Sequence, residues 1–151
     1  MSQVTAEKNK LNGTRIVRQH YANVSLGNIE HDREILSPEV VHESLVAGNI
    51  RGIAGFINNI GRFKQSFPDL RFDIRTIVEN GETVMVEAVF LGTNTGPMVG
   101  PKGTAPPTGR TVKLPFVDVW TVRNGKILEN RIYYDQLGFM SQLGLMTSSS
   151  T

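Results

Sequence analysis

The sequence contains no cysteine. This absence excludes a disulfide scaffold, cysteine-ligated zinc, iron–sulfur clusters and a thiol nucleophile. A chain of 151 residues buries enough surface to fold without disulfides or a structural metal. We therefore expect a single domain over residues 1–151, with a tail at 147–151, made only of Ser and Thr, that is disordered.

Long hydrophobic runs are also missing. No stretch reaches the roughly 18 to 20 apolar residues of a membrane span, and the first ten residues lack the apolar segment of a secretory signal. The formal net charge is only +2, and Lys and Arg are scattered along the chain, so no nucleic-acid partner is implied. These absences predict a cytoplasmic protein that binds neither membranes nor nucleic acid.

The motifs of several enzyme classes are absent as well. The sequence has no HExxH, GxGxxG, Walker or GxSxG motif, which leaves metalloprotease, dinucleotide, nucleotide and hydrolase-elbow sites without support. We expect neither a metal nor a cofactor.

Apolar periodicity divides the chain into a helical first half and a strand-rich second half, which predicts an α+β fold. Asn-Gly pairs at 80–81 and 124–125 predict antiparallel hairpins. The helices are expected at about 11–26, 28–36 and 52–66, and a terminal turn or helix at 135–146. The strands are expected at about 40–46, 71–79, 83–92, 111–122 and 126–134.

These elements predict a cone, in which a curved antiparallel sheet wraps around the N-terminal helices and an apolar pocket lies between them. The segment 93–109, with four glycines and four prolines, is longer than a simple connection needs. Such a loop is typical of a lid, a binding loop or an oligomer contact.

Asp118 is the first candidate for chemistry. It is the only charge among the alternating residues of one strand face, which are Val112, Leu114, Phe116, Asp118, Trp120 and Val122. Burial among aromatic side chains raises the pKa of a carboxyl toward the range useful for a general acid or base. The competing interpretation is an ion-paired or hydrogen-bonded structural aspartate.

The register of the last hairpin decides which residue faces Asp118. A two-residue turn places Arg131 opposite it as an ion pair, whereas a three-residue turn with a bulge places Asn130 there. We favour the second register because it separates apolar from charged residues more cleanly. Its inward-facing residues are Leu128, Ile132 and Tyr134.

His42 is the second candidate, since a histidine titrates near neutral pH and can move protons or orient a carbonyl. A lone histidine on a short strand is more often structural. His20 and His31 have polar neighbours on helices, and we expect both at the surface. Glu87 alternates with apolar residues and ranks below Asp118 and His42.

Several short motifs between residues 17 and 144 together resemble the SnoaL-like polyketide cyclases of the nuclear transport factor 2-like superfamily. They are Phe67-Pro68-Asp69-Leu70, Gly92-Thr93-Asn94-Thr95-Gly96, Pro106-Pro107-Thr108-Gly109-Arg110, Asn124-Gly125-Lys126-Ile127, Tyr134-Asp135-Gln136-Leu137 and Gln142-Leu143-Gly144. The resemblance implies the cone described above, a homodimer packed through the sheets, and cofactor-free cyclisation of a polyketide ester by intramolecular aldol chemistry.

The family's acid–base residues are an aspartate on the last strand and a histidine on the preceding strand. This sequence has Ile132 at the position of the aspartate and Asp118 at the position of the histidine. Isoleucine cannot move a proton. Either Asp118 has taken over the acid–base role, or the chemistry is different.

Two hypotheses follow from these residues. The first, which we favour, is a cyclase or isomerase acting on a small hydrophobic carbonyl substrate, with Asp118 abstracting a proton and His42, Asn130 or Tyr134 holding the oxyanion. The second, favoured by Ile132, is a non-catalytic protein that binds a small hydrophobic ligand, or another enzyme of the superfamily such as an epoxide hydrolase or dehydratase. The predicted substrate-binding residues are Phe56, Ile60, Phe63, Phe116, Trp120, Asn130, Ile132 and Tyr134.

Overall fold

A computed structural model describes residues 12–46, 48–100 and 103–146, so the predicted disorder of 147–151 lies outside the described residues. Its helices are α2 (Asn12–Ser25), the 3-10 helix η1 (Ile29–Glu34), α3 (Ile53–Ser66) and α4 (Gln136–Gln142). Its strands are β1 (Leu36–Ser44), β2 (Gly48–Arg51), β3 (Arg71–Asn80), β4 (Thr83–Thr93), β5 (Met98–Gly100), β6 (Gly103–Ala105), β7 (Thr111–Arg123) and β8 (Lys126–Tyr134). None of the helices in these ranges is long and apolar enough to cross a membrane.

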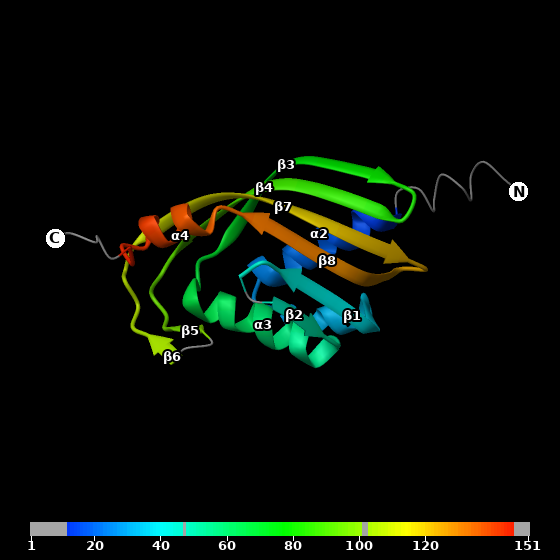
Figure 1. Ribbon diagram of the computed structural model, residues 1–151. Helices are drawn as coiled ribbons and strands as arrows, with labels where there is room; N and C mark the ends of the chain where they lie inside the picture. Colours follow the sequence, from blue (N-terminus) through cyan, green and yellow to red (C-terminus); the bar gives the residue numbers. More distant parts are fainter. Residues whose placement is uncertain (1–11, 47, 101–102, 147–151) are drawn as a thin grey trace, which may run out of the picture.

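Six strands form one curved sheet in the order β2-β1-β8-β7-β4-β3, which bends over helices α2 and α3 (Figure 1). The α+β prediction is confirmed, including the four long strands and their antiparallel pairing. The pair formed by β1 and β8 is parallel, and β2 and β3 are edge strands, so the sheet is open and does not close into a barrel. Helix α2 packs on β3, β4 and β7, and α3 packs on β1 and β2.

The favoured register of the last hairpin is wrong. Arg123 pairs with Lys126 across a two-residue turn whose residues, Asn124 and Gly125, both have positive φ. A bulge in β8 then leaves Leu128 unpaired and shifts the later pairs by one residue. Asp118 therefore lies opposite Ile132, and Asn130 lies two pairs along, opposite Trp120. The bulge still puts Asn130, Ile132 and Tyr134 on the inward face, but the buried residue near the turn is Ile127 instead of Leu128.

The segment 93–109 contains the small hairpin of β5 and β6 and is fixed at its base to the end of α3. Buried Asn94 donates to the carbonyls of Ser66 and Gly96 and accepts from the backbone and hydroxyl of Thr108. Gly96 lies so close to the helix that a Cβ atom there would be 1.8 Å from the carbonyl oxygen of Gln65. Only glycine fits this close approach, which holds the hairpin beside α3.

Deleting residues 97–105 is expected to impair ligand binding or dimerisation without unfolding the protein. The pairing of Met98 with Ala105 brings the ends of the deletion together, and the four hydrogen bonds of Asn94 lie outside it. Ligand-induced quenching of the fluorescence of Trp120, the single tryptophan, and sedimentation would measure the two properties. Unchanged behaviour in both would refute a role for this hairpin.

Candidate active site

Asp118 lies near the middle of β7 and faces inward, with only 4% of its surface exposed. The Tyr21 hydroxyl donates to Oδ2 over 2.5 Å, and the Asn130 amide donates to Oδ1 over 3.1 Å. Both donors are neutral. Arg131, the ion-pair partner considered for Asp118, bonds Glu129 instead over 2.5 Å. The ion pair between Asp118 and Arg131 is therefore wrong, whereas the hydrogen-bonded structural aspartate stays an alternative to a general acid or base.

Burial controls the protonation of this carboxyl. Loss of hydration raises the pKa of Asp118, while the hydrogen bonds from Tyr21 and Asn130 and the nearby His20 and His42 act in the opposite direction. Burial, together with the negative charge of Asp118, also raises the pKa of Tyr21 well above its usual value. Tyr21 therefore stays a neutral hydrogen-bond donor, and the raised pKa of Asp118 favours proton exchange.

His42 joins the same network from β1. Its Nδ1 lies 2.7 Å from Oδ1 of Asn130, its neighbour in the parallel pairing of β1 with β8. Because the amide of Asn130 donates to Asp118, its carbonyl oxygen must accept from His42, which assigns the proton of neutral His42 to Nδ1. The structure thus brings together Asp118, Asn130 and His42.

His42 is expected to remain neutral at physiological pH. Burial lowers its pKa from 6.5, outweighing the hydrogen bond to Asn130 and the charge of Asp118. The stability contributed by neutral His42 is present above its unfolded pKa and is lost as pH falls through the lowered folded value. A ¹⁵N NMR titration checks this, because the midpoint of the His42 signals should lie below pH 6.5. Protonation above that value would contradict the burial argument.

Two contributors to the site are not predicted from the sequence. The helical pattern places Tyr21 only on an apolar face, but its hydroxyl binds Asp118 and accepts a hydrogen bond from the Trp120 indole over 3.2 Å. A buried tyrosine hydroxyl requires a polar partner, which is a usable signal for such a role. His20, expected at the surface, is instead 4% exposed, whereas His31 is exposed as expected.

His20 forms a buried pair with Asp32 of η1. Its Nδ1 is 2.6 Å from Oδ2 of Asp32, which is fully buried, and the Asn23 amide donates to Oδ1 over 2.8 Å. The sequence carries a signal for this burial, because His20 follows Val17 by three residues and precedes Val24 by four, which places it on the apolar stripe of α2. Glu87, in contrast, is exposed and accepts a hydrogen bond from Thr76.

The hydrophobic members of the predicted substrate-binding set lie in or against one hydrophobic core. The ring centroid of Phe56 lies 6.0 Å from that of His42 and 5.7 Å from that of His20, and Phe116 lies 6.5 Å from Tyr21. The buried members are Phe56, Phe116, Trp120 and Asn130, and the half-buried members are Ile60, Phe63, Ile132 and Tyr134.

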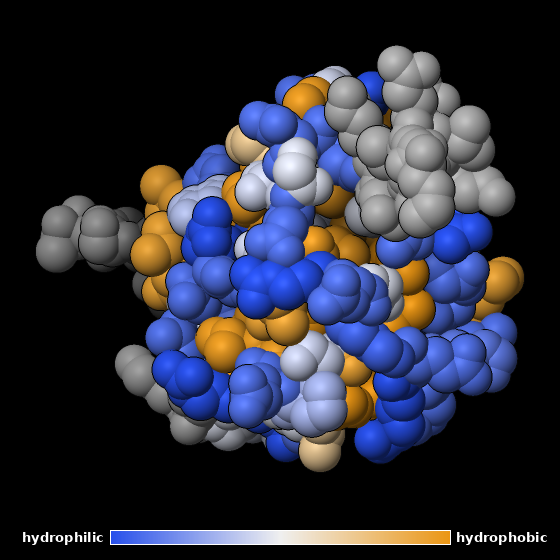
Figure 2. Space-filling view, turned by 90° about the vertical axis from the view of Figure 1, so that its right-hand side faces the viewer, coloured by the Kyte–Doolittle hydropathy of each residue, from blue (hydrophilic) through white to orange (hydrophobic). Residues whose placement is uncertain are grey.

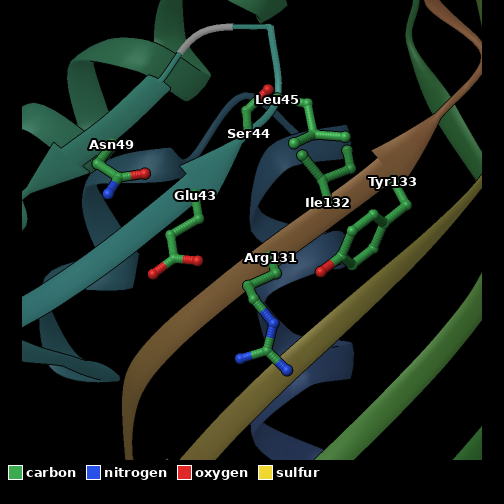
Figure 3. Close-up of a pocket in the computed structure, with 7 residues that line it drawn as sticks. All are labelled: Glu43, Ser44, Leu45, Asn49, Arg131, Ile132 and Tyr133. Carbon is green, nitrogen blue, oxygen red and sulfur yellow. The ribbon is translucent and has the colours of Figure 1, made fainter.

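Two hollows in the described surface each reach the edge of this core, at Ile132 and at Ile57. A hollow of about 100 Å³ near the end of β1 includes Ile132, the only predicted substrate-binding residue in its lining, beside Glu43, Arg131 and Tyr133 (Figure 3). A second hollow, of about 220 Å³, lies between η1 and α3. Between the sheet and the helices, the hydrophobic members of the set belong to the core or pack against it, and neither hollow is the apolar pocket predicted there.

The arrangement places a buried carboxyl, Asp118, between two neutral hydrogen-bond donors. Neutral His42 is connected to it through Asn130. Such a set suits proton transfer at carbon without a bound cation, because the carboxyl changes charge inside an apolar interior. Within the described ranges, no three His, Asp or Glu side chains are grouped as a metal site would need.

Fold and site together define an α+β protein with a buried, hydrogen-bonded carboxyl enclosed between a curved sheet and its helices. The family model described as SnoaL-like polyketide cyclase matches residues 15–143. The chain belongs to this family. No curated protein matches it.

Three solved structures illustrate the similarity. A protein from Jannaschia sp. CCS1, named with the SnoaL-like polyketide cyclases, is 23% identical with a TM-score of 0.81, covering 91% of this chain and 95% of that one. IdmH from Streptomyces antibioticus, named as a polyketide cyclase, is 26% identical with a TM-score of 0.74 and coverage of 87% and 98%. AclR from Streptomyces galilaeus, named as a hydroxylase, is 19% identical with a TM-score of 0.77 and coverage of 91% and 99%. The first and third similarities show the fold alone.

Proposed function

We propose that this protein is a cofactor-independent cyclase or isomerase that acts on a small hydrophobic polyketide-like carbonyl compound by acid–base proton transfer. One observation carries the proposal: Asp118 is buried, its pKa is raised, and both of its oxygens are held by neutral donors. A carboxyl that serves only structure is more stable when a cation or exposure to water compensates its charge.

The proposed reaction is an intramolecular aldol closure. Ionised Asp118 takes a proton from a carbon next to a carbonyl, and the resulting enolate carbon bonds to a second carbonyl carbon, whose oxygen becomes an alkoxide. The alkoxide then takes up a proton, and Asp118 releases the one it took, so the reaction is an isomerisation overall. Asn130 and Tyr134 are proposed to hold the oxyanion, because hydrogen bonds to developing charge lower the barrier. His42, whose Nδ1 proton is donated to Asn130, is proposed to orient that amide.

The cross-strand geometry supports this transfer of roles. Asp118 lies directly opposite Ile132, the position at which the family's motif has its acid–base aspartate. A carboxyl on β7 therefore projects toward the same part of the interior as one on β8 would. Substrate is proposed to enter along the half-buried side chains, namely Ile60, Phe63, Ile132 and Tyr134.

Proton exchange at carbon tests the proposal with simple carbonyl compounds in place of the natural substrate. The probes are 2-acetylnaphthalene and methyl esters of aromatic β-keto acids in D₂O, with loss of the signal next to the carbonyl followed by ¹H NMR. The wild type should accelerate exchange over buffer, and Asp118→Asn should not. Quenching of Trp120 fluorescence by the probes without exchange would overturn the enzyme and support the second candidate, a ligand-binding protein, which Ile132 favours.

A homodimer packed through the outer sheet face is also proposed. Val78, Met85 and Val119 are paired in one row across three strands, and Val78 and Met85 are 56% and 47% exposed. Tyr133, 46% exposed, lies in the next row. Hydrophilic residues cover most of the end of the molecule seen in Figure 2 and separate its hydrophobic side chains. The apolar row is thus the better candidate for contact with a second copy.

Met85→Glu should convert the dimer into a monomer, because it buries a charge on each side of the interface. Sedimentation velocity measures the change. The control is Leu26→Glu, which alters another exposed apolar residue outside the sheet and should leave the dimer intact. A monomeric wild type, or a Met85→Glu variant that stays dimeric, would exclude this interface.

A further inference from the structure

The buried pair of His20 and Asp32 has no part in the mechanism proposed above. Asp32 is completely enclosed, and its two oxygens are held by His20 and Asn23 at 2.6 and 2.8 Å. Enclosing a carboxyl and an imidazole costs hydration free energy. Two neutral polar side chains would connect α2 to η1 at a lower cost. An ionisable pair in this position therefore points to a role beyond connection.

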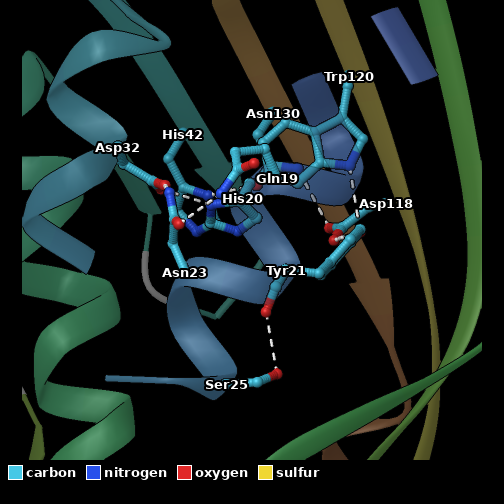
Figure 4. Close-up of polar contacts among 10 residues, drawn as sticks. All are labelled: Gln19, His20, Tyr21, Asn23, Ser25, Asp32, His42, Asp118, Trp120 and Asn130. Carbon is cyan, nitrogen blue, oxygen red and sulfur yellow. Dashed lines mark hydrogen bonds and ion pairs between the residues drawn. The ribbon is translucent and has the colours of Figure 1, made fainter. Parts of the chain in front are cut away.

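The position of His20 indicates what that role is. Its ring centroid is 4.8 Å from Trp120 and 5.3 Å from Tyr21, the two residues joined by a hydrogen bond next to Asp118. Figure 4 shows the pair and Asp118 within one polar cluster between α2 and the sheet. The imidazole is thus within the same interior as the carboxyl proposed to act as the base.

The hydrogen bond to Asp32 leaves the other ring nitrogen of His20 available for chemistry. An Nδ1–H donated to a carboxylate fixes the tautomer, and the carboxylate stabilises the imidazolium when Nε2 also carries a proton. Among the described residues, the hydrogen bonds of His20 involve Nδ1 alone. The titratable groups around the ring are Asp32 on η1, Tyr21 on its own helix, His42 on β1 and Asp118 on β7.

We propose that His20, oriented by Asp32, is the general acid that protonates the new alkoxide while Asp118 acts as the base. The inference rests on the proposed aldol reaction. Asp118 gains the proton from carbon, the new carbon–carbon bond forms, and His20 transfers its Nε2 proton to the oxygen. One proton then passes from Asp118 to His20, which restores both groups without any co-reactant.

The test compares His20→Asn and Asp32→Asn with the wild type, using Gln19→Ala as the control. The asparagine at position 20 places an amide near Nδ1 and can still donate to Asp32, but it cannot titrate. Gln19 is exposed and bonds only Asn23 among these residues. A general acid takes part in the reaction through its proton, so His20→Asn should lower kcat by about 10²-fold and change the pH profile of kcat.

Fluorescence of Trp120 provides a readout that does not require activity. The ring centroids of His20 and Trp120 are 4.8 Å apart, so the pH dependence of the emission should differ between the wild type and both His20→Asn and Asp32→Asn. It should be unchanged in Gln19→Ala. In Asp32→Asn the oxygen can still accept from Asn23, while the amide can donate to Nδ1 of the other His20 tautomer, so this variant serves if His20→Asn does not fold.

The outcomes separate the two proposals. If Asp118→Asn is inactive while both His20→Asn and Asp32→Asn keep the wild-type pH profile, the general-acid role of His20 is overturned and the function of Asp118 stands. A lower melting temperature with an unchanged pH profile identifies His20 and Asp32 as structural only. If the wild type neither exchanges nor cyclises the carbonyl probes, the proposed function fails, and with it the role of His20.

Discussion

Replacing Asp118 with asparagine is expected to lower turnover by at least about 10²-fold while the protein stays folded. Asparagine reproduces the neutral carboxyl, because its oxygen can accept from Asn130 and its amide can donate to the Tyr21 hydroxyl, the two partners of Asp118. Only the ability to exchange a proton is lost. Initial rates and circular dichroism of the wild type and Asp118→Asn measure the two effects.

The same variant has a predicted pH-dependent stability. Burial raises the folded-state pKa of Asp118 above 3.8, so the stability contributed by the protonated carboxyl is fully present below 3.8 and is lost as pH rises through the folded value. At pH 8 the melting temperature of Asp118→Asn should therefore be at least as high as that of the wild type. Any difference in melting temperature in favour of the variant should become smaller toward pH 4. Early melting at pH 8 with normal specific activity would make Asp118 structural and favour the ligand-binding protein.

The second large effect is expected at Ile132. In the Asp118→Asn background, Ile132→Asp places a carboxyl on the facing strand, directly opposite position 118. We expect the double variant to turn over at least about tenfold faster than Asp118→Asn, which is a fraction of the usual contribution of a general base. Ile132→Asn in the same background is the matched control, since it adds polarity without a titratable proton, and it should restore nothing.

In the wild-type background, Ile132→Asp should destabilise the protein. Two opposed carboxyls in an apolar interior cannot both ionise, so they titrate as a coupled pair. The pair retains one proton to higher pH, and losing that proton would place two negative charges side by side. Thermal unfolding from pH 5 to 8 should show a growing loss of melting temperature. A folded double variant as inactive as Asp118→Asn would show that the two strand positions do not project into one site.

Local patterns predict the elements but not all of their pairings. The alternation around Asp118 and the Asn-Gly turn identify β7 and β8 directly, because strand faces and two-residue turns have local signatures. The bulge that leaves Leu128 unpaired depends on how β8 also pairs with β1, a contact distant in the sequence. The shared face of Asn130, Ile132 and Tyr134 follows from the sequence, whereas their partners across the hairpin do not.

The candidate site divides in the same way. Asp118 and His42 are identifiable from residue type and neighbours, but Tyr21, 97 positions from Asp118, becomes its partner only when α2 crosses the sheet. His20 occupies an apolar-stripe position, yet its burial depends on the carboxylate of Asp32. Polar residues are buried in a core when they have hydrogen-bond partners, and here those partners are too distant in the sequence to be recognised from a local pattern. The cytoplasmic location and the single-domain organisation stay predictions.

A crystal structure with a bound aromatic ketone tests the central claim most directly. We predict the ketone between β7 and α3, with the carbon next to its carbonyl about 3 to 3.5 Å from an Asp118 oxygen, the separation of a near-attack arrangement. Displacement of the Tyr21 or Asn130 hydrogen bond should accompany it. A ketone bound in the hollow beside Glu43 and Arg131, with Asp118 still held by Tyr21 and Asn130, would contradict the assignment of Asp118 as the acid–base residue.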